Sequence, residues 1–222
     1  MIFKTRGIVF RFTKFGETSI IVTIFTEQFG LQSYIVNGVR SKSSKNKIAL
    51  YQPLTLLNLV VYHREHANIE RIKETSCVHP YRTLTADVKK STLAMFITEL
   101  LNKTVKDESH GGEVFPFVFD SLIALDGLQA GYENFHLIFM LKLARHLGFG
   151  VFSAAEALGG RVVDRETESK LNDLLQSNYD TMLQIDNIQR RKLLELLLKF
   201  YAEHMEHLGE IKSVQVLREV FM

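Results

Sequence analysis

The sequence predicts an α+β protein in which a small five-stranded β-barrel is followed by an all-helical domain. Three observations support this fold class. Five short segments rich in β-branched and aromatic residues lie before Pro80. Beyond Pro80, apolar residues recur at helical spacing instead. The charge divides in the same way: residues 1–82 hold 12 Lys and Arg against 5 Asp and Glu, whereas residues 83–222 hold 15 against 20.

The strands are expected where apolar side chains alternate between turn residues. Gly16 and Gly30 mark two of these turns, and Asn37-Gly38 marks the end of the third strand. Closure into a barrel is expected because it removes the exposed edges of short strands. The expected strands fill residues 7–26, as two strands separated by a turn at 15–17, and then residues 31–36, 54–62 and 68–73.

The helices are expected where apolar residues repeat every three or four positions. Ser91 or Thr92 is a candidate cap for the first helix, and Pro116 fits the first turn of the second. The predicted domains are therefore residues 1–79 and 80–222. The expected helices end at Asn102 and near Asp126, and then span residues 133–147, 168–176, 187–208 and 214–221.

Composition and motifs exclude several classes of protein. Cys77 is the one cysteine, which rules out an intramolecular disulfide and any zinc module built on several cysteines. The apolar runs are too short to span a membrane, and the N-terminus lacks the apolar core of a secretory signal. The expected compartment is the cytosol.

The sequence nominates no catalytic site. It contains neither a P-loop nor a Gly-x-Gly-x-x-Gly turn, and it has no Gly-x-Ser-x-Gly elbow. His204 and His207 lie three residues apart on an expected helix, but nothing supplies the further ligands that zinc needs. We therefore expect a protein that is not an enzyme and that uses no cofactor and no metal.

The segment 40–47 carries four basic side chains and no acid. Cations along a backbone, combined with aromatic faces for bases, are what single-stranded nucleic acid requires. Phe10 and Phe12 are expected in the core, Phe15 is a candidate stacking surface, and Tyr34 is equally compatible with core and stacking. The candidate nucleic-acid-binding residues are Arg6, Arg11, Lys14, Tyr34, Arg40, Lys42, Lys45 and Lys47.

Several segments, in order along the whole chain, resemble those of the RecO family of bacterial recombination mediators and DNA repair proteins. The matching segments are Lys4-Thr-Arg-Gly-Ile-Val9, Gly16-Glu-Thr-Ser19, Phe25-Thr-Glu27 with Gly30, Gly38-Val-Arg-Ser-Lys42, Ala49-Leu-Tyr-Gln-Pro53, His146-Leu-Gly-Phe-Gly150, Leu208-Gly and Lys212-Ser-Val-Gln-Val-Leu-Arg218.

The resemblance implies an OB-fold barrel that binds single- and double-stranded DNA, in a protein of the cytoplasm and nucleoid. It also implies annealing of complementary strands and loading of recombinase onto strands coated by single-strand-binding protein. The implied partners are RecR and the acidic C-terminal tail of single-strand-binding protein. Arg40 and Lys42 match the family's basic loop. Lys142 and Arg145 are the cations near the helix that holds the tail in some relatives.

Two other functions fit the residues. An OB-fold protein could act on RNA, which would require contacts to the 2′-hydroxyl. A protein-interaction adaptor could use the basic surface to bind an acidic peptide. Affinity for matched DNA and RNA oligonucleotides separates the first alternative, and the absence of nucleic-acid binding at low salt would favour the second.

Overall fold

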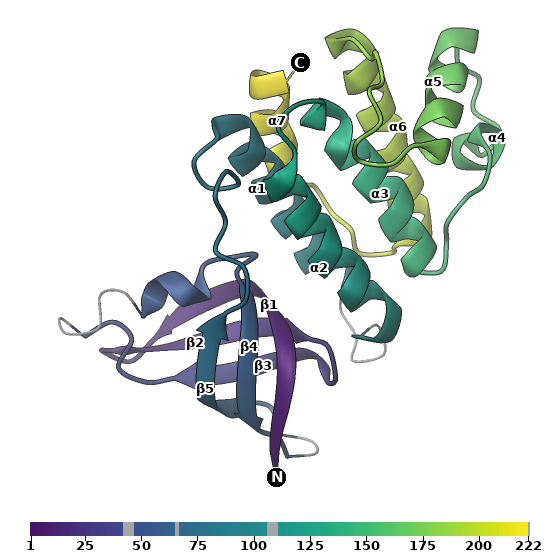
Figure 1. Ribbon diagram of the computed structural model, residues 1–222. Helices are drawn as coiled ribbons and strands as arrows, with labels where there is room; N and C mark the ends of the chain where they lie inside the picture. The colour runs from purple at the N-terminus through teal and green to yellow at the C-terminus, as the bar shows by residue number, and fades with distance from the viewer. Residues whose placement is uncertain (42–46, 65–66, 106–110, 222) are drawn as a thin grey trace. The chain divides into compact units, whose positions relative to one another are not determined.

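The computed structural model describes residues 1–41, 47–64, 67–105 and 111–221. Its first five strands close into a barrel in the order β1-β2-β3-β5-β4, followed by a helical region (Figure 1), which confirms the predicted fold class. A five-stranded closed barrel of this kind is the OB-fold. The strands are β1 (Ile2–Phe15), β2 (Ser19–Thr26), β3 (Gly30–Val36), β4 (Leu56–Tyr62) and β5 (Glu70–Cys77), with a short 3-10 helix, η2 (Ile48–Tyr51), before β4.

The long strand β1 closes the barrel because it pairs with two partners. Its first half, from Ile2 to Ile8, is antiparallel to β4, and its second half continues alongside β2. A bulge between Val9 and Arg11 lets the strand bend between the two. Gly7 lies where the strands approach closely, since a Cβ there would come within 2.6 Å of the Ile24 side chain.

The barrel core is formed by one face of each strand. Val22 of β2, Tyr34 of β3 and Glu70 of β5 are in-register neighbours, and all three are buried. The neighbouring in-register row, which contains Ile21, Ile35 and Arg71, therefore points outward. Alternation thus separates an apolar interior from an outer face that is available to partners.

The helical region contains seven α-helices among the described residues. Helix α3 is buried along most of its length and contacts α1, α5 and α6, so it forms the centre of this region. The helices are α1 (Val88–Thr104), α2 (Gly111–Gly127), α3 (Phe135–His146), α4 (Ala154–Leu158), α5 (Arg165–Gln176), α6 (Asn187–His204) and α7 (Ser213–Phe221), with a 3-10 turn, η4 (Tyr132–Asn134), before α3. None of the helices that the structure describes combines the length and the apolar character needed to cross a membrane.

The chain divides into two compact units. One contains Met1–Pro80 with Val105–Phe119, and the other contains Tyr81–Thr104 with the rest of the chain from Asp120. The start of the second unit is fixed by Asp126, whose carboxylate accepts hydrogen bonds from the backbone N–H groups of residues 82–84. The buried Lys90 ammonium donates to the backbone carbonyl of the same Asp126.

Two expected helix starts differ from the structure. Helix α1 begins at Val88, before Ser91 and Thr92, because the Asp87 carboxylate accepts the backbone N–H groups of Lys89 and Lys90 and so caps the helix. Helix α2 begins at Gly111, which leaves Pro116 inside the helix and beyond its first turn.

Candidate nucleic-acid interface

Two of the predicted cations lie at the turn between β1 and β2. The Arg40 guanidinium donates to the carbonyl oxygen of Gly16 at 3.1 Å, and the Arg40 backbone N–H donates to the Thr18 carbonyl at 2.9 Å. Lys14 is exposed two residues before Gly16. The fold therefore brings Arg40, which follows β3, to the end of the β1–β2 hairpin that carries Lys14.

An aromatic ring accompanies these cations. Phe15 is the last residue of β1, and 49% of its surface is exposed. We refer to Lys14, Phe15 and Arg40 as the turn cluster. Glu17, an exposed acid, lies in the same turn, so the turn cluster and Glu17 together carry a formal charge of +1. The combination of cations and an exposed ring is suited to a nucleic-acid strand.

The remaining basic residues of the segment 40–47 are only partly described. Lys47 is exposed and immediately precedes η2. Lys42 and Lys45 lie outside the described residues. Their assignment to the interface, like that of Lys47, stays a prediction.

Arg11 lies on the outer face of β1, just after the bulge. It is exposed and pairs in register with Thr23 of β2. Phe15 lies four residues further along β1, so its side chain points to the same face of the strand. Arg11 can therefore extend the positive surface of the turn cluster along β1.

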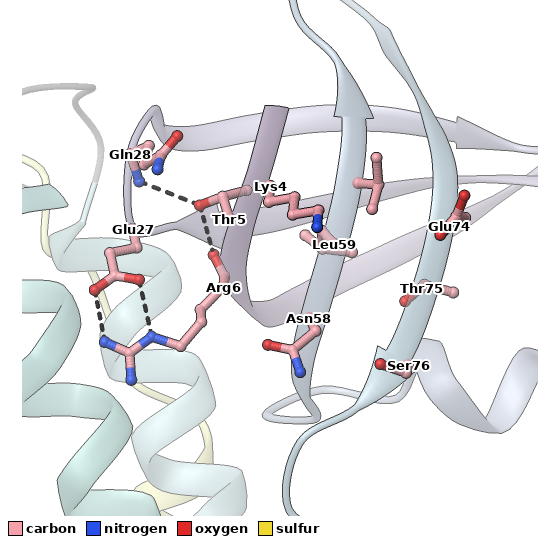
Figure 2. Close-up of a pocket in the computed structure, with 11 residues that line it drawn as sticks. Lys4, Thr5, Arg6, Glu27, Gln28, Asn58, Leu59, Glu74, Thr75 and Ser76 are labelled. Carbon is pink, nitrogen blue, oxygen red and sulfur yellow. Dashed lines mark hydrogen bonds and ion pairs between the residues drawn. The ribbon is translucent and has the colours of Figure 1, made fainter. Parts of the chain in front are cut away.

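Arg6 is engaged within its own unit (Figure 2). Its guanidinium makes a two-point contact with the Glu27 carboxylate, with N–O distances of 2.8 and 2.6 Å, and lies 4.7 Å from the ring centre of Phe119. The hydrogen bond from Arg6 holds the pKa of Glu27 below its usual value. Because Glu27 balances its charge, Arg6 contributes less to an anion-binding surface than the exposed Arg11 and Lys14.

Tyr34 lies in the barrel core. Its side chain is fully buried among the apolar residues of β1, β2 and β4, and burial raises the pKa of its hydroxyl. A base needs an open ring face to stack upon, and Tyr34 offers none in this structure. Of the two interpretations that the sequence left open, the structure places Tyr34 in the core, and we leave it out of the proposed interface.

Sequence reasoning missed a second basic and aromatic group on the barrel. Tyr62 is 43% exposed at the end of β4, and the exposed Arg64 and Arg71 lie nearby in the lining of a hollow of about 500 Å³. We refer to this feature as the Tyr62 hollow. Tyr62 and Arg71 both fall in segments expected to be strands, but only the β4–β5 register reveals that they are direct neighbours.

A further hollow, of about 490 Å³, lies on strands β1, β4 and β5 (Figure 2). Its lining includes Lys4 and the Arg6–Glu27 pair, together with Asn58, Glu74 and Ser76. Both signs of charge line it, so it does not favour an anionic ligand in the way that the turn cluster and the Tyr62 hollow do. Among the described residues, no group of three or more His, Cys, Asp or Glu side chains is arranged to hold a metal ion.

A closed five-stranded barrel with a basic, aromatic turn defines the class of OB-fold proteins that bind oligonucleotides or oligosaccharides. Comparison with protein families narrows this class. The family model described as "Recombination protein O N terminal" matches residues 1–81, and "Recombination protein O C terminal" matches residues 85–169.

Proteins named "DNA repair protein RecO" match the chain over nearly its whole length. The protein of Phocaeicola vulgatus is 32% identical over 100% of both chains, and that of Flavobacterium psychrophilum is 35% identical over 98% of both. The protein of Bacteroides fragilis is 30% identical over 100% of both chains. This chain belongs to the RecO family of DNA repair and recombination proteins.

Proposed function

We propose that this protein is a non-enzymatic recombination mediator that binds DNA through its barrel. It anneals complementary strands and helps to load recombinase onto single strands coated by single-strand-binding protein. Residues 1–79 hold the DNA, and residues 80–222 provide the docking surface for protein partners. Membership of the RecO family supports this role, which is exercised in the cytoplasm, on the nucleoid.

The observation that carries the DNA-binding part of the proposal is the turn cluster. Arg40 is held against the hairpin by two hydrogen bonds, so its charge is presented from an ordered backbone. Lys14 and the exposed ring of Phe15 lie at the same turn. Phosphates would bind to the cations, while a base could stack on Phe15.

RecR and the acidic tail of single-strand-binding protein are the proposed protein partners. Helix α3 offers a surface suited to the tail, because Lys142 and Arg145 lie on it and the exposed Phe152 follows it. The Arg145 guanidinium lies 5.4 Å from the ring centre of Phe152. Two cations beside an open aromatic ring can bind a peptide that is acidic and ends in an apolar residue.

Salt-dependent DNA binding tests the proposal. Lys14→Gln combined with Arg40→Gln should weaken binding to single-stranded DNA of any sequence. Because each lost phosphate contact releases fewer counterions, the slope of log K against log salt should become shallower by about 1.4 for two contacts. The measurement is fluorescence anisotropy with a labelled oligonucleotide over a range of salt concentrations.

The matched control is Arg165→Gln combined with Lys170→Gln, which removes one Arg and one Lys from helix α5. This control should keep the wild-type slope. An unchanged slope in the turn variant would remove the turn cluster from the interface. Stronger binding to a matched RNA would favour the RNA-binding alternative, and no binding to either at low salt would favour the adaptor.

A further inference from the structure

The turn cluster and the Tyr62 hollow are connected by one row of outward-facing residues. Each member pairs in register with the next on the adjacent strand, so all of them point to the same side of the sheet. The row runs through Thr13 of β1, Ile21 of β2, Ile35 of β3, Arg71 of β5 and Tyr62 of β4. With strands about 4.8 Å apart, Tyr62 lies about 19 Å from Thr13 along this row.

The far end of the row has the chemistry of a base-stacking site. The Tyr62 ring is 43% exposed, and Arg64 and Arg71, which share the lining of its hollow, are both exposed. Ile69, which is 48% exposed, adds an apolar wall. Large apolar side chains that are open to solvent beside arginines mark a surface that is covered by a partner.

The charge of the hollow favours an anionic occupant. Glu70 is the acid in its described lining, and it is only 4% exposed. Its Oε1 atom accepts the backbone N–H of Arg64 at 2.9 Å and lies 2.8 Å from Nδ1 of His63. The acid is thus directed to groups of the barrel itself, whereas the two guanidinium groups are at the surface.

We propose that the Tyr62 hollow takes an unstacked base of a single DNA strand, whose backbone follows the outward row from the turn cluster and meets Arg71 and Arg64. This inference rests on the proposed DNA-binding function and specifies its substrate as single-stranded DNA. The ring faces of bases inside a duplex are covered by their neighbours, and exposing one requires unpairing and unstacking. The hollow therefore favours single strands over duplex.

The test compares Tyr62→Leu with Tyr62→Phe. Leucine keeps an apolar side chain on β4 but has no aromatic face, so affinity for single-stranded DNA should fall roughly 5- to 150-fold, the range found for loss of one stacked base. Phenylalanine should retain the wild-type affinity. Duplex affinity should be unchanged in both variants. Arg71→Gln should reduce the salt slope on single strands by about 0.7.

Lys73→Gln is the matched control for Arg71→Gln, because Lys73 lies on the same strand, pairs with Glu74 and is not part of the hollow's described lining. Wild-type single-strand affinity in Tyr62→Leu would overturn the inference, as would an equal loss on single strands and duplex. If that result accompanied the expected loss in the Lys14 and Arg40 variant, the proposed function would stand while the hollow would not. A wild-type protein that binds no DNA would overturn the proposed function itself.

Discussion

At the scale of single residues, His136 couples the stability of the helical unit to pH. Its side chain is fully buried on α3, near the ring of Phe96. Burial, together with the nearby Arg190 cation, lowers the pKa of His136 to about 3, against an ordinary value of 6.5, although a backbone hydrogen bond opposes the shift. The unfolded chain therefore binds a proton between pH 6.5 and 3 that the folded chain does not, so stability falls as the pH decreases through this range.

We predict that the free energy of unfolding of the wild type falls by about 1.4 kcal/mol more than that of His136→Gln between pH 7.5 and 5.5. Urea unfolding at the two pH values measures this difference. Comparing the two pH dependences cancels the contributions of the other titrating groups and any loss of stability caused by the substitution itself. Equal pH dependence in the two proteins would show that His136 is not held neutral by the fold.

Individual residues also show how far the sequence could predict the site. Lys14 and Arg40 were identifiable as cations, but their placement at one turn depends on hydrogen bonds that Arg40 makes to Gly16 and Thr18. The aromatic residues were harder to assign. Tyr34 and Phe15 both lie on predicted strands, and only the register shows that the first is buried and the second exposed.

At the scale of elements, hydrophobic period predicted the barrel and most of the helices. The boundaries were less predictable, because they depend on single contacts from outside the periodic segment. Asp87 starts α1 earlier than the apolar pattern does. Pairing with β4 extends β5 to Cys77, beyond the segment that the residues alone suggested. Helix α4 was not predicted, since five residues are too few to display a helical period.

Helix α3 is the element on which the binding of the acidic tail can be tested. Lys142 donates to the Asn178 side chain, and burial followed by the Arg145 charge lowers the pKa of its ammonium group, which an acidic ligand would relieve. Arg145→Gln should weaken binding of an acidic peptide with an apolar C-terminal residue about tenfold, equivalent to about 1.4 kcal/mol.

Titration of the peptide by fluorescence anisotropy measures this loss. Arg165→Gln, which makes the same change on α5, serves as the control and should bind like the wild type. Undiminished binding by the Arg145 variant would exclude this surface of α3 as the docking site for the tail.

At the scale of the whole molecule, the charge is unevenly distributed between the two parts of the chain. Residues 1–82 carry a formal charge of +7 and residues 83–222 a charge of −5. A positive barrel attracts DNA over distances comparable with the Debye length, while an acidic helical region does not compete for the same phosphates. This division of charge was readable from the sequence, whereas the track across the barrel required the strand register.

The central claim is that the barrel surface beginning at the turn cluster holds DNA strands for annealing. The most direct measurement is the rate at which complementary oligonucleotides, coated with single-strand-binding protein, anneal in the presence of the wild type or of the Lys14→Gln, Arg40→Gln variant. The account predicts that the wild type accelerates annealing, less so as salt increases, and that the variant accelerates it much less. Equal acceleration by the two proteins at every salt concentration would contradict it.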